Sequence, residues 1–155
     1  MICFLAMMKP SLASAATKPF SRELHDQNDE PAKNAVWRYL FNTWKVEVEE
    51  GDTFGVDLVC YRNRKVVGYV EVERRHNWVD EFPFATVHVP FRKQKFLSLD
   101  KPMTLFSVRS DLAQALWCPG QDIKNSPVEV KSNKFVHEEK FYVVPIEKWR
   151  KVCLP

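Results

Sequence analysis

Glycine is scarce in this sequence, and its scarcity excludes one large class of binding sites. Only four glycines occur among the 155 residues, and none stands in a run. Phosphate-binding loops need closely spaced glycines, because their backbone N–H groups must approach the phosphates. The sequence therefore contains no phosphate-cradling glycine loop, and it gives no support for a Ser/His/Asp catalytic arrangement.

Paired cysteines and long apolar runs are also missing. The four cysteines stand singly, without the paired spacing of a zinc site or a redox dithiol. We therefore expect a reducing, intracellular setting, in which Cys60 is a small buried apolar residue. No apolar run approaches the roughly 20 residues of a membrane helix. A soluble, cytoplasmic protein is the expectation.

The N-terminal residues 1–27 are expected to form a disordered or weakly ordered leader. They begin with an apolar run followed by small residues, as a secretory signal does, but a basic start is missing and Lys9-Pro10 interrupts the run early. Met7 and Met8 are alternative starts. Residues 28–155 have the size and the apolar content of a single domain. The net charge of +3 permits a polyanionic partner without requiring one.

The first part of the domain predicts a helix followed by strands. NDEPAKNAVWRYLFNTW (28–44) has helical spacing of its apolar residues, with Asn28 or Asp29 as the cap and a proline in the first turn. KVEVEE (45–50) alternates with period two and precedes a turn at Gly51-Asp52. We expect this helix to pack on a sheet.

The later segments predict more strands and one inserted helix. FATVHVP (84–90) and MTLFSVRS (103–110) predict strands, FRKQKFLSL (91–99) predicts an amphipathic helix, and LAQALWC (112–118) is ambiguous. KFYVVPIEKWRKV (140–152) predicts a strand, a break at proline and a short basic helix or strand. The expected fold class is an α+β or α/β sandwich built on one central mixed sheet flanked by helices.

Three carboxylates lie on two strands that otherwise look like core, in the stretch GVDLVCYRNRKVVGYVEVERRHNW (55–78). Because side chains alternate along a strand, Glu71 and Glu73 share one face, about 6–7 Å apart, and Val66, Val70 and Val72 share the other. Each strand is thus expected to bury one face and to carry acids on the other.

The register of the hairpin decides whether Asp57 joins the two glutamates. On the first strand, Asp57 faces away from the apolar set Val56, Leu58 and Cys60. A three-residue loop at 63–65 brings Asp57 opposite Glu71, whereas a two-residue loop pairs it with a valine and turns it to the other face. We expect the three-residue loop, because the Asn-Gly or Asp-Gly typical of a tight turn is missing.

Carboxylates gathered on one sheet face repel each other unless a cation or solvent compensates them. An oxygen-only arrangement suits a hard cation such as Mg²⁺, which keeps waters for chemistry and stabilises charge on a phosphoryl oxygen. The pattern predicts a phosphodiester hydrolase. The alternative is that the glutamates simply form the solvated face of a half-exposed strand.

These residues resemble the PD-(D/E)XK nuclease superfamily, the restriction-endonuclease-like fold, over about residues 29–75. Its members look like a helix, a hairpin carrying an acid, and an acid-x-lysine about ten to twenty residues later. The resemblance makes Asp57 the first acid, Glu71 the second, and Glu73 the replacement of the lysine that helps to position the attacking water. It implies that these three residues bind metal and catalyse. The alternative alignment, Glu73-Arg74-Arg75, is less suitable, because arginine stays protonated and cannot act as a base.

Basic residues cluster around this predicted hairpin in three places, and such clusters neutralise phosphates or form an ordinary solvated face. They are Arg62, Arg64 and Lys65; Arg74, Arg75 and His76; and Arg92, Lys93 and Lys95. The candidate nucleic-acid contacts are Arg75, Arg92, Lys93 and Lys95. Glu30, Arg74 and His76 are accessory candidates.

The resulting hypothesis is an Mg²⁺- or Mn²⁺-dependent endo- or exodeoxyribonuclease that acts on DNA, in a phage, mobile-element or repair context. One alternative is a nuclease fold that has lost its activity and binds nucleic acid or a protein partner. Another is an unrelated α+β adaptor with an exposed acidic strand. A homodimer is an open alternative to a monomer.

Overall fold

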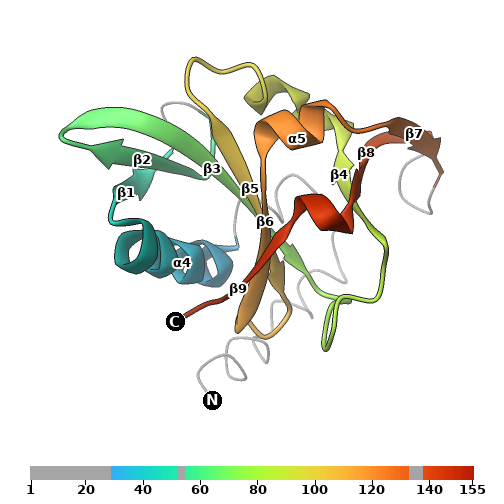
Figure 1. Ribbon diagram of the computed structural model, residues 1–155, viewed down its shortest axis with the longest axis horizontal. Coiled ribbons are helices and arrows are strands. Elements are labelled where there is room, and N and C mark those ends of the chain that lie inside the picture. Colours follow the sequence, from blue (N-terminus) through green and yellow to red (C-terminus); the bar gives the residue numbers. More distant parts are fainter. Residues whose placement is uncertain (1–28, 52–54, 133–137) are drawn as a thin grey trace, which may run out of the picture.

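The computed structural model describes residues 29–51, 55–132 and 138–155 as α+β structure with a central mixed sheet (Figure 1). The expected leader over 1–27, the candidate cap Asn28 and the second residue of the Gly51-Asp52 turn lie outside these ranges. Within them, no helix has the length and apolar character needed to cross a bilayer.

The predicted N-terminal helix is confirmed as α4 (Glu30–Tyr39). The Asp29 carboxylate caps it by accepting a hydrogen bond from the Ala32 N–H at 3.3 Å. Pro31 fits the first turn, where an N–H would have no partner within the helix. The helix continues directly into a π-helical turn, η1 (Leu40–Trp44), so the predicted span is helical to its end.

In the described part of the chain, the central sheet has six strands. In their order across the sheet they are β1 (Glu47–Glu50), β2 (Leu58–Arg62), β3 (Lys65–Arg75), β5 (Met103–Arg109), β6 (Gln114–Pro119) and β9 (Arg150–Cys153). β3 and β5 are parallel, and every other neighbouring pair is antiparallel. The sheet is mixed because the chain leaves it after β3 and returns alongside β3 in the same direction.

A second sheet lies beyond the central one, so the prediction of a single sheet is wrong. Its three antiparallel strands are, in order, β4 (Thr86–Pro90), β8 (Glu139–Pro145) and β7 (Val128–Lys131). The reason lies in the central strands, which are apolar on both faces. Tyr69 and Val70 are consecutive on β3 and point to opposite faces, yet both are almost fully buried. A helix can cover only one of these faces.

The described residues also form three short helical segments. They are η3 (Phe91–Phe96), α5 (Gly120–Lys124) and η4 (Ile146–Lys148). The amphipathic helix predicted over 91–99 is a six-residue 3₁₀ helix, in which side chains three residues apart point the same way. Lys93 and Phe96 are the two buried residues of η3. The ambiguous segment 112–118 contributes most of β6, and the break after Pro145 leads through η4 into β9.

Two hydrophobic cores lie on the two faces of the central sheet. One packs α4 against the sheet and includes Val36, Leu40, Val70 and Phe106. The other packs the second sheet against it and includes Tyr69, Val89, Leu105 and Val144. Figure 1 shows α4 on one side of the central sheet and β4 and β8 on the other. The expectation that the strands of the hairpin bury only one face is therefore wrong.

The turn of the β2–β3 hairpin is shorter than predicted. Arg62 pairs with Lys65, which leaves a loop of two residues, Asn63 and Arg64. Both loop residues have positive φ, 53° and 64°, as a type I′ turn requires. The prediction of a three-residue loop is wrong because Asn adopts the left-handed conformation readily, so the tight turn forms without glycine.

A β-bulge restores the register that the shorter loop would change. The pairing shifts by one residue between Cys60 and Tyr61, and Val67 is the extra residue on β3. Leu58 consequently pairs with Val70, the offset that the longer loop was predicted to give. Asp57, which directly precedes β2, is thereby brought beside Glu71.

Two valines face the opposite core from the one predicted. Val66 and Val56 pack in the second core, whereas Val70 and Leu58 lie in the core under α4. Val66 precedes the bulge, and Val56 precedes the first residue of β2. The regular alternation of a strand therefore does not extend to either residue.

Candidate functional site

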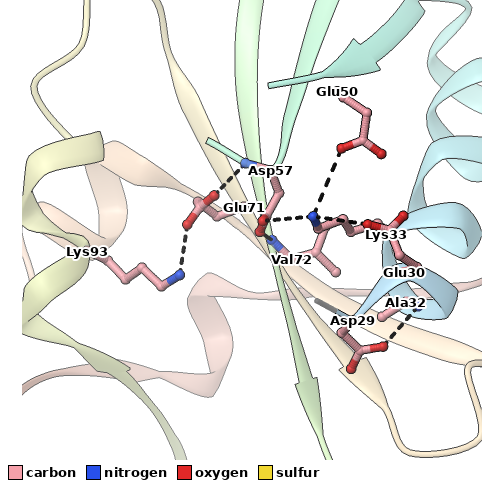
Figure 2. Close-up of polar contacts among 9 residues, drawn as sticks. All are labelled: Asp29, Glu30, Ala32, Lys33, Glu50, Asp57, Glu71, Val72 and Lys93. Carbon is pink, nitrogen blue, oxygen red and sulfur yellow. Dashed lines mark hydrogen bonds and ion pairs between the residues drawn. The ribbon is translucent and has the colours of Figure 1, made fainter. Parts of the chain in front are cut away.

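Two acidic residues meet where β2 and β3 separate. The Asp57 N–H donates a hydrogen bond to Glu71 Oε2 at 2.8 Å, and Asp57 Oδ2 accepts one from the Val72 N–H, also at 2.8 Å. These bonds take the place of the strand pairing that ends at Leu58 and Val70. Figure 2 shows both carboxylates beside β3 at this point. The bulged hairpin thus places two acids fourteen residues apart in direct contact.

Both acids are buried. Asp57 is 9% exposed and Glu71 is 3% exposed. A buried carboxylate is costly unless hydrogen bonds and opposite charges compensate it. The alternative that the glutamates form a solvated face is therefore wrong for Glu71, and the burial of Glu71 also contradicts the exposed acidic strand of the adaptor hypothesis.

Two buried lysines approach the acids from opposite layers. Lys93 Nζ, on η3, lies 2.7 Å from Glu71 Oε1. Lys33 Nζ, on α4, lies 3.7 Å from Asp57 Oδ1. Figure 2 shows Lys93 on one side of β3 and Lys33 on the other. The site is therefore a chain of four buried residues across the central sheet, in which the adjacent acids Glu71 and Asp57 lie between Lys93 and Lys33.

The buried environment shifts the protonation of Asp57. Burial, and then the negative charge of Glu71, raise the pKa of Asp57 from 3.8 to about 7. The hydrogen bond from Val72 and the charges of Lys93 and Lys33 act in the opposite direction but are smaller. The site therefore carries an acid whose charge changes near neutral pH.

The electrostatic position of Lys93 is different. Burial by itself would lower the pKa of Lys93, but the charge of Glu71 and its hydrogen bond outweigh burial, and the pKa is raised. The charges of Glu73 and Asp57 contribute in the same direction. Lys93 is therefore a firmly protonated cation that interacts with all three acids of the predicted site.

Glu73 lies on the strand with Glu71 but forms a separate contact. Its Oε1 is 3.7 Å from the Arg75 guanidinium, and its Oε2 is buried without a hydrogen-bond partner in the described part of the chain. Within the described ranges, no three His, Cys, Asp or Glu residues are grouped closely enough to share a metal ion. The structure thus brings Asp57 and Glu71 together and leaves Glu73 beside Arg75.

The two arginines at the end of β3 make internal contacts. Arg75 donates a hydrogen bond to the His88 carbonyl at 2.7 Å. Arg74 donates two to the Ser110 carbonyl, at 2.7 and 3.1 Å, and lies 3.5 Å from Asp29. Their guanidinium groups therefore connect β3 to neighbouring segments, and these contacts stabilise the fold.

The other predicted contacts differ in exposure. Lys93 is 5% exposed, so its ammonium faces Glu71 and does not form the surface phosphate contact that was expected. Lys95 and His76 are exposed, and Arg92 is half-buried. Glu30 is exposed and lies 3.6 Å from Lys33, at the outer end of the site.

Sequence reasoning missed Lys33. Its nearest chain neighbours on the buried face of α4 are Ala32, Ala35 and Val36. A lysine within an apolar helical stripe is the signal that could have identified it, because lysine is seldom fully buried without a partner. The acid that it meets, Asp57, is far away in the sequence.

Asp57 and Glu71 are the residues of this site that could hold a hard divalent cation. The side-chain atoms that the pair would offer a metal ion are all carboxylate oxygens. Mg²⁺ is commonly bound by one or two carboxylates together with waters and phosphate oxygens. The fixed positions of Asp57 Oδ2 and Glu71 Oε2, each held by a backbone N–H, agree with such a site. Glu73 is not part of the pair.

Comparison of the sequence with protein-family models and with curated proteins gives no match. The function is therefore inferred from the residues of the site and their geometry.

Proposed function

We propose that this protein is a metal-dependent nuclease that hydrolyses DNA phosphodiester bonds at Asp57 and Glu71. The observation that carries the proposal is the hydrogen bond from the Asp57 backbone N–H to the buried Glu71 carboxylate, next to an Asp57 side chain whose pKa is raised to about 7 by burial and by the charge of Glu71. Adjacent buried acids with perturbed pKa values are typical of active sites. A fold gains little stability from them, because apolar residues of similar size would pack at lower cost.

The local order of elements supports a PD-(D/E)XK type of nuclease. The helix α4 precedes the β2–β3 hairpin, Asp57 directly precedes β2, and Glu71 follows on β3 fourteen residues later. This spacing lies within the range that the resemblance implies. Glu73 makes the motif a Glu-x-Glu variant, and a restriction-endonuclease-like fold is part of the proposal.

Asp57 and Glu71 would hold Mg²⁺ or Mn²⁺, which would polarise a phosphoryl oxygen and make a bound water a stronger acid. Neighbouring groups of the chain orient the two carboxylates and compensate their charge. One oxygen of each carboxylate accepts a backbone N–H, which fixes the orientation of the carboxylate. Lys33 and Lys93 compensate the negative charge.

The remaining cations of η3 are the proposed DNA contacts. Arg92 and Lys95 flank Lys93 on a six-residue helix, and Lys95 is exposed. Cations beside an acidic site attract the phosphate backbone and do so without reading sequence. Arg75 is a weaker candidate, since it already contacts Glu73 and the His88 carbonyl.

Cleavage of supercoiled plasmid DNA in Mg²⁺ or Mn²⁺ tests the proposal. Asp57→Asn and Glu71→Gln should lose cleavage, while each keeps an oxygen that accepts the backbone N–H. Glu81→Gln is the matched control, because Glu81 is an exposed acid that contacts Lys151. Circular dichroism checks that all variants fold. Cleavage by both site variants at the wild-type rate, or a wild-type protein inactive on duplex and single-stranded DNA, would contradict the proposal.

A second candidate function is a binding module derived from the same fold. It is favoured by the two buried lysines, which already compensate Asp57 and Glu71, and by Glu73 at the position of the motif lysine. Calorimetric titration with Mn²⁺ and a DNA gel shift at low salt separate the candidates. DNA binding without a Mn²⁺ signal supports the module. A chain that binds neither supports a protein-interaction role.

A further inference from the structure

The position that resembles a motif lysine carries an acid in this chain, yet a lysine reaches the site from another segment. Lys93 belongs to η3, between β4 and β5, and its Nζ donates a hydrogen bond to Glu71 Oε1 at 2.7 Å. The residue is 5% exposed. The ammonium therefore contacts the second acid of the proposed site from outside the hairpin that carries both acids.

The geometry of η3 explains how Lys93 is placed beside Glu71. Side chains three residues apart eclipse in a 3₁₀ helix, so Lys93 and Phe96 point together towards the central sheet, and both are buried. The Lys93 ammonium lies 5.8 Å from the centroid of the Phe96 ring. Phe96 is a member of the second core. The lysine is thus held by packing and is not a free surface chain.

Stability alone does not account for a lysine in this place. Replacing both partners of a buried ion pair by apolar residues is often neutral or stabilising, so the pair is weak evidence for a purely structural role. Lys93 also interacts with Asp57 and Glu73 in addition to Glu71. A buried ammonium beside the acids of a proposed phosphodiesterase site can stabilise negative charge that develops there during hydrolysis.

We propose that Lys93 is the positioning lysine of the nuclease site, supplied by η3 in place of the lysine that Glu73 displaces from β3. It orients the Glu71 carboxylate and provides the cationic hydrogen-bond donor of the site. This inference rests on the proposed nuclease function. It assigns a chemical role to a residue that the sequence pattern alone places among surface phosphate contacts.

Lys93→Met tests the inference against Lys151→Met, a control at an exposed lysine that contacts Glu81 outside the proposed site. At saturating Mn²⁺ and DNA, we expect the turnover of Lys93→Met to fall by about 100-fold, the scale of losing one preorganised donor. Mn²⁺ binding, measured by calorimetry, should persist because Asp57 and Glu71 remain. Lys151→Met should keep the wild-type turnover. Wild-type turnover in Lys93→Met would overturn the inference and would leave the nuclease proposal intact.

Lys93→Arg covers the case in which Lys93→Met does not fold. Arginine keeps the positive charge beside Glu71 but replaces a compact ammonium by a planar guanidinium. If Lys93 acts only as a counter-ion, Lys93→Arg should keep the wild-type turnover, and that result would overturn the inference. A positioning lysine predicts a loss of turnover of at least about 10-fold with Mn²⁺ binding retained. A wild-type protein without metal-dependent cleavage would instead refute the nuclease proposal itself.

Discussion

The contact between Lys93 and Glu71 makes a quantitative prediction about stability. Substitution of Lys93 by Met leaves the Glu71 carboxylate buried without a cation. The side chains of the pair are 7% and 4% exposed and their charged atoms are 2.7 Å apart, so solvent screens the interaction little. Removal of one partner from a buried ion pair costs about 3–5 kcal/mol. At about 2–4 °C per kcal/mol for a domain of this size, the melting temperature should fall by roughly 6–20 °C.

Urea unfolding followed by circular dichroism measures this loss. Lys151→Met is the control, because the contact of Lys151 with Glu81 is exposed and should contribute little. The double variant Glu71→Gln, Lys93→Met should recover most of the stability, since glutamine is neutral and can still accept the Asp57 N–H. A loss in Lys93→Met no larger than that in Lys151→Met would refute the reasoning, because it would mean that Glu71 needs no buried partner.

Three further predictions concern Asp57, the hairpin turn and DNA. Burial raises the pKa of Asp57 from 3.8 to about 7, so its contribution to stability is fully present at low pH and is lost as the pH rises through about 7. As the pH rises from about 4 to about 8, the free energy of unfolding of Asp57→Asn should therefore increase relative to that of the wild type, as measured by urea unfolding. A difference between the two proteins that stays constant with pH would contradict this. Arg64 has a φ of 64°, so Arg64→Gly should stabilise the protein by roughly 0.5–1 kcal/mol while Arg64→Ala should not; equal unfolding midpoints would argue against strain. Lys95→Glu should weaken DNA binding and reduce its salt dependence by about one phosphate contact, and an unchanged salt dependence would exclude Lys95 from the interface.

The elements of the fold were largely predictable from local patterns. α4 follows from the helical spacing of its apolar residues, from the capping carboxylate of Asp29 and from Pro31 in the first turn. β1, β4, β5 and β8 follow from their apolar or alternating runs between turn residues. The second sheet was missed because periodicity shows that a face is apolar but does not show which element covers it.

The register of the hairpin was predicted for the wrong reason. The loop is one residue shorter than predicted, and the bulge at Val67 adds that residue back to β3. The two differences cancel, so Asp57 meets Glu71 as predicted. Gly68 directly follows the extra residue Val67, and an isolated glycine inside a strand pattern is the signal that could have indicated the bulge.

The burial of Lys33 and Lys93 and their acidic partners could not be predicted from the sequence. Charged residues were assigned to the surface, because burial of a charge depends on a partner that local sequence does not reveal. Lys93 and Glu71 are 22 residues apart and come together only when η3 packs on the central sheet. The alternation of the strands singled out the two acids, but the three-dimensional arrangement was needed to identify Lys33 and Lys93 as their partners.

Anomalous diffraction from a crystal soaked in Mn²⁺ tests the central claim most directly. The account predicts one anomalous peak coordinated by carboxylate oxygens of Asp57 and Glu71, and its absence from a crystal of the Glu71→Gln variant. A peak elsewhere, or no peak while Lys33 and Lys93 still contact the two acids, would contradict the claim that this buried pair is a metal site.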